Sequence, residues 1–345
     1  MKGFSQKEES TVGVKATFHT GAILPHRPLV NEVIEGHTQA YEISFYKSTT
    51  GKKEWQQLYN YPKMGVSALA VNLGNERELG MGYGIFPYIE IPLNKRKLNL
   101  RIKIGYGLGY IEKPFNRETN YKNITIGSHY NAIIYVNMGW AIKLSNAFST
   151  SAGVSLIHFS NGSYSRPNLG LNNFSLNTGL AYNFGEKKKH IVNDITERPH
   201  KWTKKVMFGV GVKEILLVDG PKYFVSSYSF NLIKTRAQKS SFGFGADVFY
   251  NTSLSNLIAE DKSSTPSDLD DFRVGLVGIY SFDFGRVSFL IEMGGYVFSK
   301  YKGNGDIYNR FVTRFNVTDK VFINLSMKTH FAVADFIEYG VGYNF

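Results

Sequence analysis

The sequence predicts an all-β protein, an antiparallel β-barrel of the type that spans the bacterial outer membrane. Segments of strand length that alternate apolar with polar or small residues recur along most of the chain, separated by turn residues. The 26 Phe and 22 Tyr are numerous, and many stand near segment ends, as in the aromatic girdles of membrane barrels. The mean hydropathy is −0.21 and no apolar run reaches the length of a transmembrane helix, which excludes a helical membrane protein.

The first half of the chain contains eight candidate strands. They span residues 12–24, 40–48, 64–73, 79–93, 98–111, 131–144, 147–159 and 173–184. Long and short connections alternate through much of this half, as do the outer loops and periplasmic turns of bacterial barrels. The connection 49–63, which contains Trp55 and Tyr59, is too long for a periplasmic turn and predicts a short interfacial helix.

Residues 186–203 form a charged, strand-poor segment, after which the alternation resumes. The later candidate strands span residues 206–217, 223–234, 241–250, 272–284, 287–298, 309–317, 321–331 and 336–345. Because the charged segment is far longer than a hairpin turn, we predict two tandem eight-stranded barrels, residues 1–185 and 204–345, joined by the linker 186–203. The alternative is one barrel of about sixteen strands, which would also leave no sheet edge.

The second barrel resembles a degenerate repeat of the first. Gly179–Phe184 matches Gly340–Phe345, and Ile157–Ser160 falls opposite Thr329–Ala332. The second copy therefore has His330 but no serine two residues later. The alternative is that any two barrel halves look alike because their strands share one pattern.

Charge and cysteine content limit the possible partners. The net charge of +12 suits a surface that meets anionic lipid or lipopolysaccharide phosphates. Nucleic acid is not a predicted partner, because the sequence has no basic helix, zinc ligands or RNP-like aromatic strand. Without cysteine, neither a disulfide nor a thiolate metal site can form. His19 and His129 stand in no metal-ligand spacing, so neither a metal nor another cofactor is predicted.

The most informative stretch runs from His158 to Asn172, where a candidate strand ends on a histidine and a serine two positions apart. Residues i and i+2 of a strand point to the same face, so His158 and Ser160 lie side by side. A hydroxyl nucleophile and its general base require this geometry. The Asn-rich loop that follows can supply amide donors to an oxyanion.

The same stretch resembles the PagL family of outer-membrane lipid A deacylases, which remove ester-linked acyl chains from lipopolysaccharide. In that family a His-x-Ser-Asn run is followed by Pro-Asn-x-Gly and then by the third member of a catalytic triad. Here the two runs are His158–Asn161 and Pro167–Gly170. The resemblance covers roughly residues 10–185 and looks closest to the longer acyloxyacyl hydrolases of Bacteroidetes-type bacteria. The family's third residue is usually Glu, whereas this chain has Asn172.

The resemblance implies an eight-stranded barrel with a serine esterase site on its seventh strand. In such a site Ser160 attacks the ester carbonyl and His158 is its general base. Asn161 and Asn168 would hold the oxyanion through amide donors, and Asn172 would accept the His158 ring N–H. An amide orients a histidine but cannot stabilise an imidazolium as a carboxylate does.

The sequence leaves open whether Asn172 or a carboxylate such as Glu118 orients His158. Glu118 stands in a long loop outside the motif, where a solvated charge is the simpler interpretation. Arg117, Lys122 and Arg166 lie on the predicted outer side and are candidates for contact with lipid A phosphates. Barrel loops also carry such charges for solubility alone.

We therefore predict a serine esterase that removes ester-linked acyl chains from lipid A, with lipopolysaccharide and outer-membrane lipids as its partners. The alternative is a non-catalytic structural or porin-like barrel with a vestigial His-Ser pair, which Asn172 favours. The predicted localisation is the bacterial outer membrane, to which a protein must be exported. Met1–Ser10 contains no apolar region of a signal peptide, which counts against this localisation. The sequence does not specify the acyl chain removed, activity on phospholipids or the oligomeric state.

Overall fold

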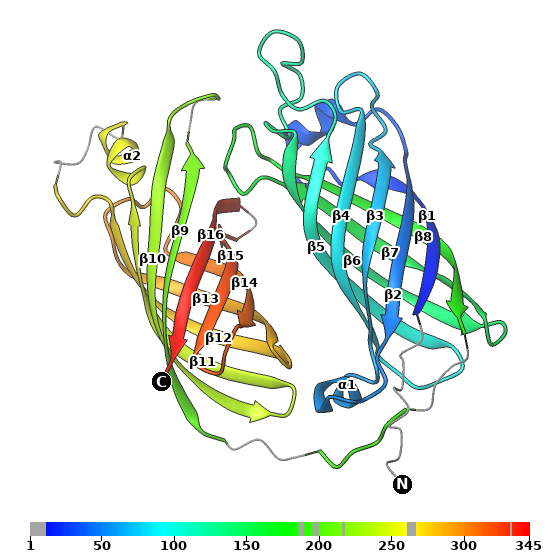
Figure 1. Cartoon of the computed structure of the whole chain (residues 1–345). Helices are drawn as coiled ribbons and strands as arrows, with labels where there is room; N and C mark the ends of the chain where they lie inside the picture. The colour runs from blue at the N-terminus through cyan, green and yellow to red at the C-terminus, as the bar shows by residue number, and fades with distance from the viewer. Residues whose placement is uncertain (1–11, 186–189, 196–199, 216–217, 261–266, 332) are drawn as a thin grey trace. The chain divides into compact units, whose positions relative to one another are not determined.

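The computed structural model describes residues 12–185, 190–195, 200–215, 218–260, 267–331 and 333–345. These residues form two closed antiparallel barrels, β1–β8 and β9–β16, drawn in Figure 1. Closure pairs β1 with β8 in the first barrel and β9 with β16 in the second. The prediction of two eight-stranded barrels is thus confirmed, and the alternative of one large barrel is wrong. Gly162–Arg166 belong to the second compact unit, whereas the residues on either side of this segment belong to the first.

The first barrel follows the predicted strand order, with bounds shifted by a few residues at most. Its elements are β1 (Val12–Ile23), η1 (Pro28–Val33), β2 (Thr38–Ser48), α1 (Glu54–Leu58), β3 (Lys63–Asn72), β4 (Met81–Pro92), β5 (Asn99–Ile111), β6 (Tyr130–Lys143), β7 (Phe148–Ser160) and β8 (Leu171–Phe184). The helix α1 lies within the connection where a short helix was predicted. The 3₁₀-helix η1 was not predicted, although Pro28 at its first position presets the helical φ angle.

The second barrel also matches the predicted strands closely. Its elements are β9 (Trp202–Glu214), β10 (Lys222–Ala237), β11 (Ser240–Asn251), α2 (Leu254–Glu260), β12 (Phe272–Phe284), β13 (Val287–Ser299), β14 (Ile307–Asn316), β15 (Val321–His330) and β16 (Val333–Asn344). The predicted strand end at Leu217 and the compared residue Ala332 lie outside the described residues. Among the described residues, no helix has the length and apolar character needed to cross a membrane.

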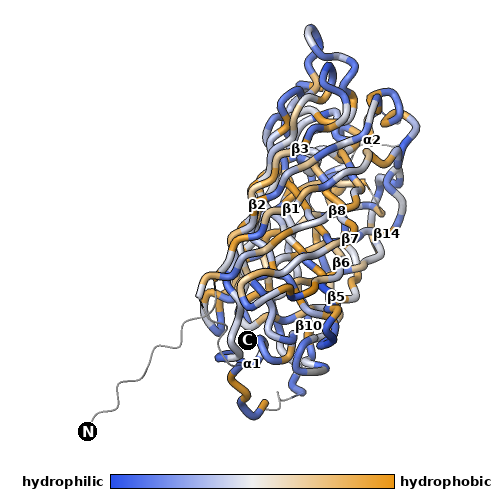
Figure 2. The backbone as a smooth tube through the Cα atoms, turned by 90° about the vertical axis from the view of Figure 1, so that its right-hand side faces the viewer, coloured by the Kyte–Doolittle hydropathy of each residue, from blue (hydrophilic) through white to orange (hydrophobic). Residues whose placement is uncertain are grey.

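Each strand turns alternate residues to the barrel interior and to the outside. In β7, Ser155, Ile157 and Phe159 are buried inside, whereas Val154 and Leu156 are exposed. In Figure 2 the hydrophobic residues concentrate along the strands, while the loops and turns are mostly hydrophilic. An apolar outer surface of this kind is what a hydrocarbon environment requires of a barrel.

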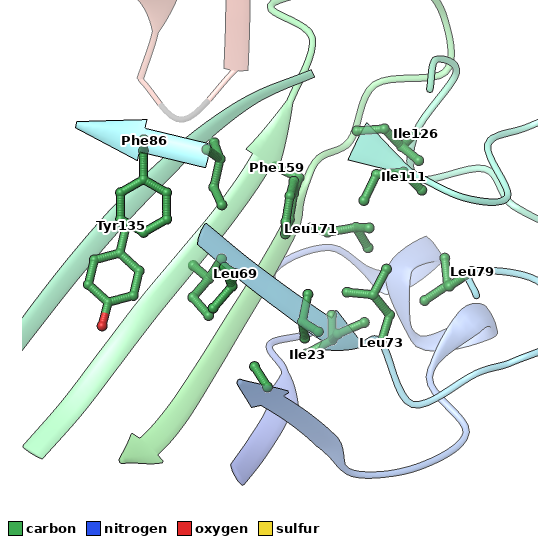
Figure 3. Packing of buried hydrophobic residues seen from close by; sticks show 14 of the residues in the cluster. Ile23, Leu69, Leu73, Leu79, Phe86, Ile111, Ile126, Tyr135, Phe159 and Leu171 are labelled. Carbon is green, nitrogen blue, oxygen red and sulfur yellow. The ribbon is translucent and has the colours of Figure 1, made fainter. Parts of the chain in front are cut away.

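An apolar cluster fills the interior of the first barrel at the end where the long loops emerge. Figure 3 shows Phe159 of β7 beside Leu171 of β8, with Ile111, Ile126 and Leu79 packed around them. Phe159 and Leu171 are also direct cross-strand partners. All five side chains are fully buried, so this cluster holds the ends of β7 and β8 in a fixed position.

Polar groups occupy the middle of the same barrel. The Glu42 carboxylate accepts hydrogen bonds from the hydroxyls of Ser44 (2.7 Å) and Ser67 (2.8 Å) and pairs with the Lys103 ammonium. The His19 ring contacts Glu42 at 3.3 Å. Each buried charge in this layer has a partner, which is the condition under which such groups are tolerated.

The second barrel has a more heavily charged interior. The Arg310 guanidinium lies 3.2 Å from Asp247 and 3.4 Å from Glu292, and it also pairs with Glu338. A second cluster joins Lys328 to Asp335 at 2.7 Å. The two barrels share a topology, but their interiors are filled by different chemistry.

Candidate active site

Pairing of β7 with β8 places His158 directly opposite Asn172. The two side chains are joined by a hydrogen bond of 2.6 Å between His158 Nδ1 and Asn172 Oδ1. Because an amide oxygen only accepts, the proton of a neutral His158 ring sits on Nδ1. The other ring nitrogen, Nε2, is then the basic one, as a general base requires.

His26 continues this chain of hydrogen bonds on the far side of Asn172. The Asn172 Nδ2 amide donates to His26 Nδ1 at 3.0 Å, and His26 Nε2–H donates to the Leu169 carbonyl at 3.0 Å. The Leu24 carbonyl lies slightly farther from the same Nδ1, at 3.2 Å. The Leu169 carbonyl therefore fixes the tautomer of His26, because it accepts the Nε2–H. His26 Nδ1 then fixes the orientation of the Asn172 amide, and the amide oxygen fixes the tautomer of His158.

His26 was missed by the sequence reasoning. It is a single histidine in a long loop, 146 residues before Asn172, and it belongs to no motif. Barrel closure brings it to the site, since β1 pairs with β8 and the Leu24 N–H bonds the Asn172 carbonyl at 2.7 Å. Only the knowledge that the first and eighth strands are neighbours would have identified it.

Ser160 is the last residue of β7 and shares the outward face with His158. The Asn168 side chain holds Ser160 in position through two hydrogen bonds. Its Oδ1 accepts the Asn161 backbone N–H at 3.1 Å, and its Nδ2 donates to Ser160 Oγ at 3.1 Å. Ser160 is only 5% exposed, although an outward position on a barrel is normally open. The Asn161 side-chain amide donates to Ser128 Oγ at 2.8 Å. The structure thus gathers all five motif residues, His158, Ser160, Asn161, Asn168 and Asn172, at one end of the β7–β8 pair.

The outer surface next to this site is apolar. Val154 and Leu156 of β7 and Phe174 and Leu176 of β8 lie on the same outward face as His158, with exposed fractions between 37% and 61%. Leu156 and Phe174 are cross-strand partners. A hydrocarbon chain can lie along this surface and reach Ser160 at its polar end.

The remaining candidate residues are not gathered at the site. Glu118 is exposed, its backbone N–H bonds Asn116 Oδ1 at 2.9 Å, and within the described residues no contact joins it to His158. Arg117 and Lys122 are exposed in the same loop. Arg166 belongs to the segment that groups with the second unit.

A second serine–histidine–carboxylate arrangement lies inside the first barrel. Ser155 Oγ is 3.0 Å from His19 Nδ1, and His19 Nε2 is 3.3 Å from Glu42. All three side chains are at most 2% exposed, and Lys103 already neutralises Glu42. No acyl ester can reach this serine, so we interpret the arrangement as part of the barrel's structural interior.

Among the described residues of the second barrel, no equivalent site is formed around His330. Lys328 and His330 lie on the inward face of β15, and His330 Nε2 is 2.9 Å from the Tyr296 hydroxyl. The sequence comparison that set His330 opposite His158 therefore matches residues of opposite orientation. Inside the barrel, His330 takes part in the charged network rather than meeting a lipid.

Comparison with known families gives two matches. The model described as Lipid A 3-O-deacylase (PagL) matches residues 39–181, and the model described as Acyloxyacyl hydrolase, C-terminal domain, matches residues 202–345. Together they cover most of the chain. Comparison with curated proteins gives no match.

Solved structures that match include two proteins of bacterial outer membranes. The outer membrane protein Omp33 of Acinetobacter baumannii is 10% identical, with a TM-score of 0.18 and 99% of each chain covered. The COG4313 outer membrane channel of Pseudomonas putida F1 is 7% identical, with a TM-score of 0.20 and 99% of each chain covered. Likenesses this weak carry no argument about this chain.

Proposed function

The chain belongs to the PagL family of lipid A deacylases, and from this premise we propose that its first barrel is a serine esterase that acts on lipid A in the outer membrane. The bond that it would hydrolyse joins an acyl chain to the sugar at position 3, following the description of the matched family. The observation that carries the proposal is the His158–Asn172 hydrogen bond on the outward face of β7 and β8, next to Ser160 and an apolar surface.

The first step is attack of Ser160 Oγ on the ester carbonyl. His158 Nε2 takes the hydroxyl proton as the new C–O bond forms, which is the role left to this nitrogen when Nδ1–H bonds Asn172. The tetrahedral intermediate then breaks its bond to the sugar oxygen, which receives the proton back from His158. An acyl-Ser160 ester remains, and a water molecule hydrolyses it by the same proton transfers in reverse roles.

Asn161 and Asn168 are the donors proposed for the oxyanion. Both groups lie at the Ser160 end of β7, where the Asn161 backbone N–H donates to Asn168 Oδ1 and the Asn168 Nδ2 amide donates to Ser160 Oγ. A carbonyl oxygen that becomes negatively charged beside Ser160 attracts these N–H groups. Donors of this kind usually contribute about 10²- to 10³-fold to the rate.

Asn172 replaces the carboxylate that is usual at this position in the family. It fixes the His158 tautomer but adds no negative charge to stabilise the imidazolium, so the rate is expected to be lower than with a carboxylate. The hydrogen bond from Asn172 to His26 compensates in part, because it prevents the amide from rotating. Within this proposal His26 is a positioning residue and Glu118 has no role.

The loop cations remain candidates for the anionic groups of the substrate. Arg117 and Lys122 are exposed in the loop between β5 and β6, which emerges at the same end of the barrel as Ser160. Arg166 was predicted for the same role because it lies on the predicted outer side. Contacts with lipid A phosphates would orient the sugar so that its acyl ester meets Ser160.

The alternative function, a non-catalytic or porin-like barrel, is less well supported. The apolar cluster around Phe159 and Leu171 fills the loop end of the first barrel, where a pore would need an open, polar lumen. The apolar outer face beside Ser160 also suits a lipid substrate rather than a solute.

Mass spectrometry of lipid A tests the proposal. Purified full-length protein in detergent is incubated with lipid A, and we expect the loss of one ester-linked acyl chain from position 3. Unchanged lipid A after incubation with correctly folded protein would support the non-catalytic alternative instead.

A further inference from the structure

The first barrel contains a second polar region that the proposed reaction does not use. A cavity of about 620 Å³ lies at the end where the short turns are found, opposite the end that carries Ser160. Ser149 and Ser151 line it at the start of β7, whereas His158 and Ser160 lie at the end of the same strand. The polar layer around Glu42 and the apolar cluster beyond it fill the interior between the two regions.

The cavity has an excess of positive charge. Lys15, Lys63 and Arg101 line it from β1, β3 and β5. Among the described lining residues Glu90 is the single carboxylate, and it is already paired with Arg101 at 2.7 Å. Four more cations line it, namely Lys95, Arg96 and Lys97 in the turn between β4 and β5 and Lys143 at the end of β6. Such a concentration of one sign of charge attracts an anion.

Several polar atoms that line this cavity are buried without a hydrogen-bond partner. They are Thr49 Oγ1, Asn99 Oδ1, Arg101 Nε, Ser151 Oγ and Asn177 Nδ2. Asn177 and Thr49 are only 8% and 9% exposed, so neither is a surface group that bulk water satisfies freely. Unpartnered buried polar atoms are uncommon and costly. Four of these five atoms can donate a hydrogen bond, which is what an oxyanion accepts.

We propose that this cavity binds a phosphate-bearing molecule that enters from the turn side of the barrel. Arg101 and Lys15 supply charge-assisted hydrogen bonds to the phosphate, and the Asn177 amide and the two hydroxyls satisfy its remaining oxygens. The volume lies in the range of sites for small organic ligands and exceeds what one phosphate fills. The ligand is therefore a phosphate monoester with a polar body, free in solution or as the headgroup of a lipid.

Titration of the full-length protein tests the proposal. The protein is folded in a zwitterionic detergent without phosphate, and binding of glycerol 3-phosphate is measured by calorimetry, with glycerol as the neutral control. A short-chain phosphatidic acid forms a second arm, and the tighter of the two phosphates identifies the source of the ligand. Lys15→Gln removes a charge inside the cavity. Lys47→Gln is the matched control, because Lys47 lies at the cavity end of β2 but is exposed on the outside of the barrel.

We expect saturable binding of at least one of the two phosphates and none of glycerol. Lys15→Gln should weaken that binding about tenfold, the loss typical of one charge-assisted hydrogen bond, whereas Lys47→Gln should leave it unchanged. Heat-modifiable gel migration verifies that both variants are folded. The proposal is overturned if neither phosphate binds the native protein, if glycerol binds equally well, or if both lysine variants behave alike.

Discussion

His158 lies near the end of β7 and His330 ends β15, and each of these strands is the seventh of its barrel. The two side chains nevertheless face opposite environments. His158 lies on the outward face of β7, bonded to Asn172 and next to an apolar surface. His330 lies on the inward face of β15, among Tyr296, Lys328 and Asp335. The sequence around them is similar, Ile-His-Phe in one and Thr-His-Phe in the other.

The difference shows that orientation, rather than residue type, decides what these histidines can do. Because side chains of a strand alternate between its two faces, a shift of one residue moves a side chain from the lipid-facing side of the barrel to its interior. The same principle separates Ser160 from Ser155 within β7, since one faces outward and the other bonds His19 inside the barrel. In the proposed mechanism the outward pair meets an acyl ester, whereas the inward residues belong to the hydrogen-bonded interior of the barrel.

The largest expected effect comes from comparing the two serines. Ser160→Ala should lower deacylation about 10⁴-fold or more, because the proposed nucleophile is lost. Ser155→Ala should retain activity but lower the free energy of unfolding by about 1–3 kcal/mol, because buried His19 and Ser175 lose a hydrogen-bond partner. Rates are measured by mass spectrometry of lipid A, and stability by the temperature at which gel migration changes. Near-native activity in Ser160→Ala would remove Ser160 from the mechanism.

The two histidines give the next largest effect. His158→Gln should lower kcat about 10³-fold, because the variant lacks the proposed general base. His330→Gln should leave kcat unchanged and reduce only the thermal stability of the protein, since His330 belongs to the interior network. Equal losses of activity in both variants would contradict the distinction between outward and inward residues.

The fold was predictable because barrel strands carry a strong local signal. The alternation of apolar and polar residues predicted both ends of β7 to within one residue and both ends of β12 without error. The length of the linker favoured two barrels. The motif brought His158, Ser160, Asn161, Asn168 and Asn172 together because they are close in sequence. His26 and the cavity around Lys15 and Arg101 depend on which strands are neighbours and which face turns inward. Such long-range information is absent from local patterns.

Substitutions of Asn172 test whether this residue orients His158. Asn172→Ala should lower kcat about 10- to 100-fold, because His158 loses the acceptor that fixes its tautomer. Asn172→Glu should raise kcat, since a carboxylate both orients the ring and stabilises the imidazolium. Single-turnover rates with lipid A separate these effects from substrate binding. If Asn172→Ala has little effect, another group orients His158, and Glu118 becomes the residue to test.

His26 has the smallest expected effect. His26→Ala should lower kcat about threefold to tenfold with little change in KM, because Asn172 keeps its bond to His158 but gains freedom to rotate. His26→Gln should recover part of the loss, since its side-chain oxygen can accept the Asn172 amide. A loss that Gln does not relieve, accompanied by an equal fall in stability, would assign His26 a purely structural role.

Covalent labelling of the nucleophile tests the central claim most directly. A fluorophosphonate with an alkyl chain is incubated with the full-length protein in detergent, and the modified residue is identified by peptide mass spectrometry. We expect one adduct, on Ser160, that is lost in His158→Gln and unaffected in His330→Gln. An adduct on Ser155 or on a serine of the second barrel, or lipid A deacylation that continues without labelling of Ser160, would contradict it.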